Sequence, residues 1–207
     1  MLGRLLGVLF RPTARAAPAG PIRLNLGCGD RLLAGYVNVD KAGQPDLRWD
    51  LETFPWPWRD DSVEHVVMSH SLEHLGATPD VFLRIMQELY RVCRDGAKLQ
   101  IIVPHPRHDN FLGDPTHVRP ITPQVLRLFS RRLNLEWQSQ GFANTPLALH
   151  HGVDFEVEES TYVLEEDYAR RWREGGGSPQ ELEKLLRNHI NVASEISIRM
   201  RVVKNPL

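Results

Sequence analysis

Hydrophobic and polar positions alternate over several short segments of the first half of the chain. Residues 22–26 alternate and stop at a glycine turn, residues 36–39 form a second short run, and residues 46–51 form a weaker third one. Residues 63–68 and 99–103 are apolar runs, which are typical of buried parallel strands. The pattern predicts five short strands in this half of the chain.

A helical period lies between the two apolar runs. Its apolar positions share one face: Phe82, Ile85, Leu89 and Val92. Thr78 is the predicted N-cap, Pro79 the first helical residue and Gly96 the C-terminal cap. Thr122 followed by Pro123 predicts a short helix through residue 129. A capping box beginning at residue 178 predicts another helix, to about residue 190.

Two longer strands are predicted in the second half, at residues 153–164 and 196–203, and the last of them alternates as a half-buried strand does. Strands that alternate with helices predict an α/β protein of three layers, with a Rossmann-like, mostly parallel sheet and an antiparallel C-terminal edge. In such sheets, ligands bind beyond the carboxyl ends of the strands.

Composition adds bounds on size and partners. The chain has 207 residues, of which 42% are hydrophobic and 25% charged, with a formal net charge of −1. We expect one soluble domain over residues 21–207, and a flexible or amphipathic extension over residues 1–20 that touches a membrane or partner weakly through residues 1–11. The near-neutral charge argues against a nucleic-acid partner. Two cysteines outside any CxxC pair favour the reducing cytoplasm.

The first strand ends in a loop with Gly27 and Gly29, which lets a ligand approach the backbone closely. A dinucleotide site would have a third glycine where this chain has Leu32, and no P-loop lysine is present. Asp40 ends the second strand, where a carboxylate can accept hydrogen bonds from both hydroxyls of a ribose. Asp50 follows at the end of the third strand, where a carboxylate could accept a hydrogen bond from the amino group of an adenine.

Six segments in this order carry a family resemblance: Leu24-Asn25-Leu26-Gly27-Cys28-Gly29, Asn38-Val39-Asp40, Asp50-Leu51, Asp61-Ser62-Val63-Glu64-His65-Val66-Val67, His70-Ser71-Leu72-Glu73-His74-Leu75 and Arg91-Val92-Cys93-Arg94-Asp95-Gly96. The series resembles the class I S-adenosylmethionine-dependent methyltransferases, in particular a group of small bacterial methyltransferase domains. The resemblance covers residues 22–104 and extends more loosely to the C-terminus. It implies the Rossmann-like methyltransferase fold, S-adenosylmethionine as cofactor and methyl transfer as activity.

The same resemblance implies the cofactor-binding residues. The loop of Gly27, Cys28 and Gly29 would contact the cofactor, with the two glycines facing its methionine end. Asp40 would hold the ribose, and Asp50 and Leu51 would frame the adenine. Ser69 or His70, at the end of the fourth strand, would lie near the methionine moiety. Only ten residues separate Gly29 from Asp40, so the first helix is expected to be short.

The histidines suggest further chemistry. His117 and His105 lie in a polar stretch after the fifth strand, and either is a candidate general base toward an acceptor hydroxyl. The alternative is that His117 and Asp114 pin this loop by hydrogen bonds. We expect no metal site, since no HExxH motif is present.

The predicted function is methyl transfer to a small-molecule or glycan-like acceptor, with O-methylation favoured. Two other functions compete with it. The first is binding of S-adenosylmethionine without catalysis, which stays open because a fold does not determine a function. The second is a metal-dependent hydrolase. The hydrolase would use five side chains from one stretch: His105, His108, Asp109, Asp114 and His117.

Overall fold

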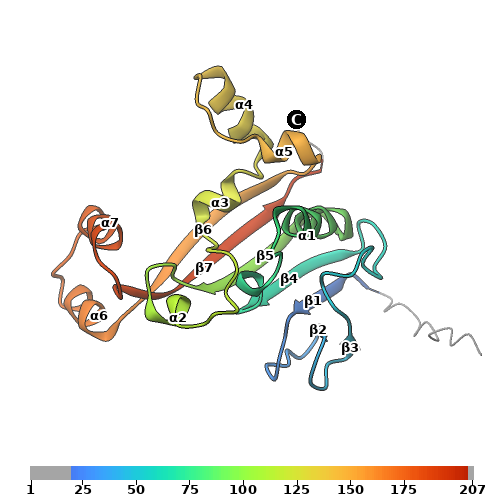
Figure 1. The fold of residues 1–207 in the computed structure, drawn as a ribbon, viewed down its shortest axis with the longest axis horizontal. Coiled ribbons are helices and arrows are strands. Elements are labelled where there is room, and N and C mark those ends of the chain that lie inside the picture. Colours follow the sequence, from blue (N-terminus) through green and yellow to red (C-terminus); the bar gives the residue numbers. More distant parts are fainter. Residues whose placement is uncertain (1–19, 205–207) are drawn as a thin grey trace, which may run out of the picture.

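The computed structural model describes residues 20–204, which fold around one seven-stranded sheet (Figure 1). The order of its strands is β3-β2-β1-β4-β5-β7-β6. Their bounds are Ile22–Leu26 (β1), Val37–Asp40 (β2), Leu47–Arg48 (β3), Val63–Ser69 (β4), Cys93–Pro104 (β5), Phe155–Leu164 (β6) and Ala193–Val202 (β7). All seven strands predicted from the sequence are present.

Six strands of the sheet run in one direction, and β7 runs in the opposite one. β1 pairs in parallel with β2 on one side and β4 on the other, and β3 and β5 extend this parallel part. β7 lies antiparallel between β5 and β6, so the predicted antiparallel C-terminal edge is confirmed. The carboxyl ends of β1 and β4 are neighbours, although their sequence positions are about 40 residues apart, and connections leave them in different directions. A ligand site is expected at this point of the sheet.

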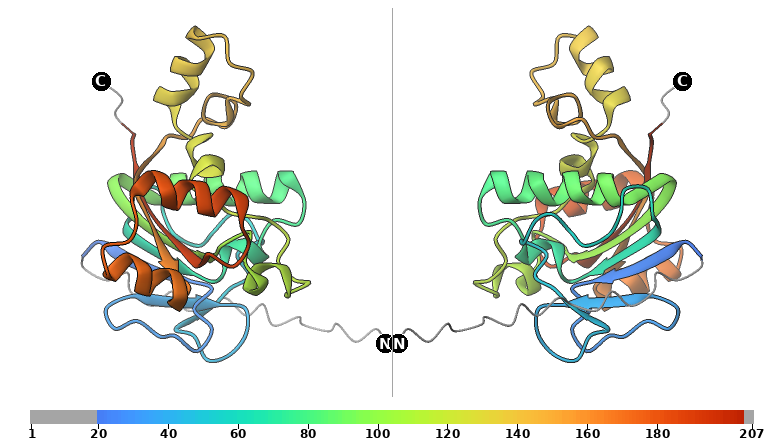
Figure 2. Two further views of the ribbon diagram at one scale, coloured as in Figure 1. Left: turned by 90° about the vertical axis from the view of Figure 1, so that its left-hand side faces the viewer. Right: turned by 90° about the vertical axis from the view of Figure 1, so that its right-hand side faces the viewer.

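Helix α1 (Pro79–Val92) connects β4 to β5 and packs on one face of the sheet (Figures 1 and 2). Its predicted apolar face is confirmed, because the four side chains of that face are buried. Thr78 is the N-cap residue and Pro79 the first helical residue, as predicted, although the Thr78 side chain makes no capping hydrogen bond. The predicted C-terminal cap is wrong, because the helix ends at Val92, before Gly96. Gly96 lies instead inside β5, at φ +72°, where the β4–β5 register shifts.

The short helix expected between Gly29 and Asp40 is absent, so this prediction is wrong. β1 and β2 are joined by a loop, whose polar backbone groups are bound by two buried amides. Asn25 Nδ2 donates to the Arg31 carbonyl at 2.8 Å, and the Leu33 amide donates to Asn38 Oδ1 at 2.8 Å. Asn25 Nδ2 also donates to Asn38 Oδ1 at 2.8 Å, so the two side chains are hydrogen-bonded to each other. Side-chain hydrogen bonds thus take the place of a helix in ordering this connection.

The other helices lie after β4 and β5: η1 (Leu72–His74), α2 (Asp109–Leu112), α3 (Pro123–Arg127), α4 (Arg131–Ser139), α5 (Leu147–His151), α6 (Glu166–Arg173) and α7 (Pro179–Asn188). The predicted helices at α3 and α7 are confirmed, and both N-caps form. The Val125 amide donates to Thr122 Oγ1, and the Glu181 amide donates to Ser178 Oγ. The sequence analysis missed α2, α4, α5 and α6. The pair α4 and α5 projects from one end of the sheet (Figures 1 and 2).

The hydrophobic core lies between the sheet and α1 and α3. β7 shows the alternation that was predicted: Ile196, Ile198 and Met200 are buried, whereas Arg199 and Arg201 face the more polar side of the sheet. There Glu158 binds Lys98 at 2.8 Å and Arg201 at 3.0 Å across the strands. No helix within residues 20–204 is long and apolar enough to cross a membrane. The predicted extension over residues 1–20 lies, except for Gly20, outside the described residues.

Candidate functional site

A pocket of about 480 Å³ opens at the carboxyl ends of β1, β2 and β4. Its lining comes from five separate stretches of the chain: Gly27, Asp40, Lys41, Trp49, Asp50, Leu51, Glu52, His70, Ser71, His74, Leu75, Ala77 and Thr116. Its size suits a small organic ligand. Five of the eight residues predicted to bind the cofactor line this single pocket: Gly27, Asp40, Asp50, Leu51 and His70.

Gly27 lies where β1 meets the segment after β4. It has φ +68°, and a Cβ at this position would lie 2.4 Å from Ser71 Cβ. Ser71 is fixed there because its hydroxyl donates to the Leu26 carbonyl at 3.0 Å. Glycine is therefore required both by the backbone conformation and by the close approach of two chain segments.

The two carboxylates are oriented by backbone amides of their own loops. Asp40 Oδ2 accepts from the Gly29 amide and Asp40 Oδ1 from the Ala42 amide, both at 2.9 Å. Asp50 Oδ1 accepts from the Glu52 amide at 3.0 Å. Each carboxylate oxygen has a second lone pair, so both side chains can still accept hydrogen bonds from a ligand. Asp40 also ties the glycine loop to β2.

Leu51 is buried at the floor of the pocket, and a tryptophan behind it fixes its position. The indole N–H of Trp56 donates to the Leu51 carbonyl at 3.0 Å, and the Trp56 amide donates to Glu88 Oε2 at 2.6 Å. Trp56 is itself buried in the core. It therefore supports the pocket without lining it.

The other three predicted cofactor residues lie beside the pocket and not in its lining. Gly29 is exposed at the tip of the loop, with φ +49°. The thiol of Cys28 turns into the protein, where burial raises its pKa. Ser69 pairs with Ile102 inside the sheet.

His70 follows β4 directly and has φ +52°, a conformation that non-glycine residues rarely adopt. Its amide still donates to the Ile102 carbonyl at 2.8 Å, while its ring turns toward β7. His70 Nε2 lies 3.1 Å from Glu195 Oε1. The unusual backbone thus brings an imidazole to the edge of the pocket.

The two candidate bases lie in different places. His117 packs against His74 of the pocket wall, with ring centroids 4.6 Å apart, and its Nδ1 lies 2.9 Å from the Phe111 carbonyl. His105 lies at the end of β5 against Tyr162, and its buried ring accepts a hydrogen bond from the Arg107 amide at 3.2 Å. Burial lowers the pKa of His105. The structure brings His117, but not His105, close to the pocket.

The residues of the alternative hydrolase separate in the same way. His108 pairs with Glu165 at 3.0 Å, in a polar hollow of about 560 Å³ that Asp109 and Asn191 also line. Asp114 and His117 lie apart from it, with His74. Within residues 20–204 the five side chains therefore do not form one metal centre. The alternative in which Asp114 pins the loop has support, because Asp114 Oδ1 accepts from the Thr116 amide at 2.8 Å.

Two residues of this region were missed by the sequence analysis. Trp49 lines the pocket, and its indole N–H is buried without a hydrogen-bond partner in the described part of the chain. Glu73 lies directly behind the pocket wall and is fully buried. The only sequence signal for Glu73 was its place between His70 and His74 in a segment already assigned to the cofactor. Trp49 carried no signal beyond its position before Asp50.

Comparison with solved structures identifies the fold. A SAM-dependent methyltransferase from Archaeoglobus fulgidus is similar with a TM-score of 0.54 at 18% sequence identity, over 88% of this chain and 86% of that one. A SAM-dependent methyltransferase from Methanosarcina mazei is similar with a TM-score of 0.50 at 14% identity, over 89% of this chain and 94% of that one. No protein-family model and no curated protein matches the chain. The chain therefore has the class I methyltransferase fold, as the resemblance implied.

Proposed function

We propose that this chain is an S-adenosylmethionine-dependent methyltransferase whose cofactor binds in the pocket beside Gly27, Asp40 and Asp50. The observation that carries this proposal is the convergence of five independently placed residues on one pocket, at the position in the sheet where this fold class binds ligands. Gly27, Asp40 and Asp50 follow different strands, and their presence in the lining of one pocket is what a shared ligand would require.

The residues present fit the cofactor. Gly27 lets the segment with Ser71 pack closely against the glycine loop, and both residues line the pocket where the methionine end would lie. Asp40 offers free carboxylate lone pairs to ribose hydroxyls, and a hydrogen bond to a charged acceptor contributes about 1.5–3 kcal/mol. Asp50 and Leu51 are adjacent in the pocket lining, where a carboxylate can accept from an amino group and an apolar side chain can contact a ring.

When bound, the cofactor supplies a methyl group activated by its sulfonium. The chain holds donor and acceptor in line, and well-oriented reactants gain about 7–11 kcal/mol in this way. His70, His74 and Thr116 also line this pocket and come from other segments than Asp40 and Asp50, so we propose that they face the acceptor. Imidazole and hydroxyl groups suit an acceptor with hydroxyl groups, such as a glycan or another small molecule. O-methylation is therefore the reaction we favour.

Isothermal titration calorimetry with S-adenosylmethionine and S-adenosylhomocysteine tests the proposal. Asp40→Ala is expected to weaken binding about 10-fold or more, from the hydrogen bonds lost. Asp30→Ala is the matched control, because Asp30 is exposed on the same loop and does not line the pocket. Absence of heat with both ligands at high protein concentration would overturn the proposal. Binding without methylation of any hydroxyl-bearing acceptor would favour the non-catalytic alternative.

A further inference from the structure

Glu73 is a buried carboxylate that lacks the partners such a group needs. Its exposed fraction is 0%, and neither carboxylate oxygen has a hydrogen-bond partner among residues 20–204. Burying a charge without a partner is costly. The nearest side chains are imidazoles, which makes this cluster a candidate for a bound positive charge.

Two of these imidazoles have a defined tautomer. His117 Nδ1 lies 2.9 Å from the Phe111 carbonyl, and because a carbonyl only accepts, Nδ1 carries the proton. In the neutral ring the lone pair is then on Nε2. The His117 ring is also stacked on Phe111, with centroids 5.1 Å apart and an angle of 20° between the planes. Its orientation is therefore fixed from two sides.

His74 reaches the same tautomer through Thr116. The Thr116 hydroxyl donates to Asp114 Oδ1 at 2.6 Å, so it can only accept from His74 Nδ1, which lies 2.9 Å away. The lone pair of His74 is again on Nε2. Metal-binding histidines are typically held in this way, with the second ring nitrogen donating to a carbonyl or to a group bonded to a carboxylate.

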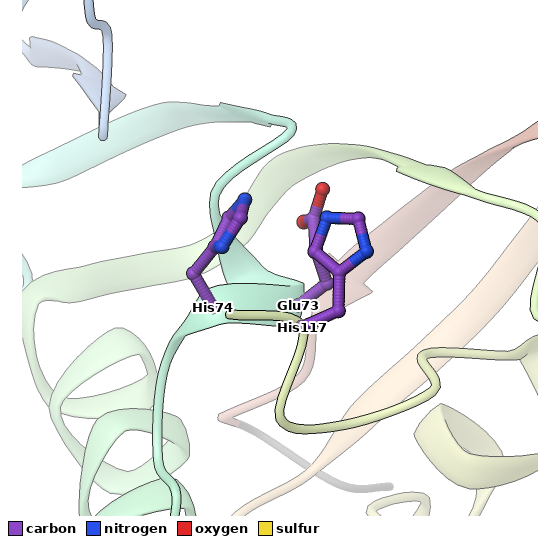
Figure 3. Close-up of side chains that lie close together, drawn as sticks. All are labelled: Glu73, His74 and His117. Carbon is purple, nitrogen blue, oxygen red and sulfur yellow. The ribbon is translucent and has the colours of Figure 1, made fainter. Parts of the chain in front are cut away.

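The three side chains lie close together (Figure 3), and His74 also lines the pocket. One ligand atom from each of Glu73, His74 and His117 lies within 4.8 Å of the others. A fourth ligand atom is near, because His70 Nδ1 lies 3.7 Å from Glu73 Oε1. Ligands around a single ion are about 3–4 Å apart, so small side-chain movements would close this set around a cation.

We propose that Glu73, His74 and His117 form a binding site for a divalent transition-metal cation, with His70 as a further ligand. One carboxylate and two or three neutral imidazoles are a donor set that suits Zn²⁺, Co²⁺ or Fe²⁺ better than Mg²⁺ or Ca²⁺, which prefer oxygen. The cation would supply the positive charge that Glu73 lacks.

The backbone holds the two halves of this site together. The amides of Val118 and Arg119 donate to the Glu73 carbonyl at 2.9 Å and 3.3 Å. These bonds fix the loop that carries His117 against η1, which carries Glu73 and His74. The ligands are therefore close to their binding positions before any cation arrives, which reduces the cost of ordering them.

His74 and Thr116 also line the proposed cofactor pocket, as does His70. The cation would therefore lie next to the acceptor side of that pocket and could bind an oxygen of the acceptor. This role rests on the proposed function. The cation site itself does not, since it is argued from Glu73 and its neighbours alone.

Titration of the chelator-treated full-length protein with Co²⁺ tests the site, read out by visible absorption. We expect one equivalent of Co²⁺ to give the d–d bands of a nitrogen- and oxygen-ligated ion. Glu73→Gln and His117→Ala should lose these bands. Thr116→Val, which removes the acceptor of the His74 proton and the hydroxyl's own bond to Asp114, should weaken Co²⁺ binding about 10–100-fold. His150→Ala is the control, because His150 is exposed on α5, and it should bind as the wild type does.

Thermal unfolding provides a second readout that does not depend on activity. In chelator, Glu73→Gln should unfold at the same or a higher temperature than the wild type, because it removes a buried carboxylate without a partner. Added Zn²⁺ should raise the unfolding temperature of the wild type and of His150→Ala, but not that of Glu73→Gln. An equal Zn²⁺ effect on all three proteins would overturn the site.

The same protein samples separate the two proposals. Wild-type protein that binds S-adenosylhomocysteine but gives no d–d bands with Co²⁺ would overturn the cation site and leave the methyltransferase proposal standing. Protein that binds Co²⁺ through Glu73 but neither cofactor form would do the reverse. Unchanged Co²⁺ affinity in Glu73→Gln would also overturn the site, whatever the wild type binds.

Discussion

The β1–β2 and β4–β5 connections leave the sheet on either side of the pocket and are built in opposite ways. The β4–β5 connection is helix α1, held by an apolar face that is buried in the core. The β1–β2 connection has no helix, and it is held by the buried amides of Asn25 and Asn38. One connection depends on buried area and the other on a few directed hydrogen bonds.

This difference has a consequence for the site. The amide-held connection carries Gly27 and ends in β2 at Asp40, so residues proposed to bind the cofactor are fixed by the same hydrogen-bond network. Helix α1 itself contributes no residue to the pocket lining and supports the core. We therefore expect damage to α1 to lower stability without changing ligand affinity, whereas damage to the amide network should lower both.

Leu89→Ala, in α1, is expected to have the largest effect on stability. Leu89 is fully buried, and such substitutions cost about 2–5 kcal/mol. Urea unfolding measures the loss, and calorimetry under folding conditions should give a wild-type affinity for S-adenosylhomocysteine. Leu135→Ala, at an exposed leucine of α4, should cost less than about 0.5 kcal/mol. A large loss of affinity in folded Leu89→Ala would contradict the separation of the two connections.

Asn38→Ala is expected to cost about 2–3 kcal/mol, because it leaves Asn25 and the Leu33 amide without their acceptor. Unlike Leu89→Ala, it should also weaken binding of S-adenosylhomocysteine, since the loop that carries Gly27 loses its support. Urea unfolding and calorimetry on the same preparation measure both effects. Asn188→Ala, at an exposed asparagine, is the control. Wild-type affinity in Asn38→Ala would show that the network does not position the loop.

Gly29→Ala and Gly96→Ala form a matched pair. Both glycines have positive φ, and an added Cβ would meet nothing within 4 Å at either position. The left-handed conformation costs a non-glycine residue about 1–2 kcal/mol, so both variants should lose a similar amount of stability. Only Gly29→Ala should weaken S-adenosylhomocysteine binding, as measured by calorimetry. A similar loss of affinity in Gly96→Ala would mean that the effect is global destabilisation.

The smallest effect is expected for Thr78→Ala. Thr78 precedes α1 without capping it, whereas Thr122 precedes α3 and accepts from the Val125 amide at 3.2 Å. Thr122→Ala should therefore cost about 1 kcal/mol and Thr78→Ala less than about 0.5 kcal/mol. Thermal unfolding of the two variants measures the difference. Equal losses would indicate that Thr78 caps α1 after all.

The strands and α1 could be predicted because hydrophobic period alone determines them. The sequence could not show that the helix expected before Asp40 is absent. Asn25 and Asn38 look like ordinary polar residues in the sequence, and the structure shows that their side chains bind loop carbonyls. The helices α4 and α6 were missed for a related reason. Neither buries a continuous apolar face, and α6 contains no buried residue.

The residues proposed to bind the cofactor were more predictable than the cluster around Glu73. Gly27, Asp40 and Asp50 follow successive strands, so the rule for parallel sheets brings them together. His117 reaches His74 only because its loop is hydrogen-bonded to the Glu73 carbonyl. No periodicity or spacing in the sequence encodes that contact. His105, which directly follows β5, turns away toward Tyr162.

Hydrogen exchange with and without S-adenosylhomocysteine tests the central claim most directly. The Gly29, Ala42 and Glu52 amides all donate to Asp40 or Asp50, so they report on these carboxylates. We predict slower exchange in peptides covering residues 27–29, 40–42 and 49–52, with no change in β6. No protection at saturating ligand, or protection only at the hollow lined by His108 and Asn191, would contradict the account.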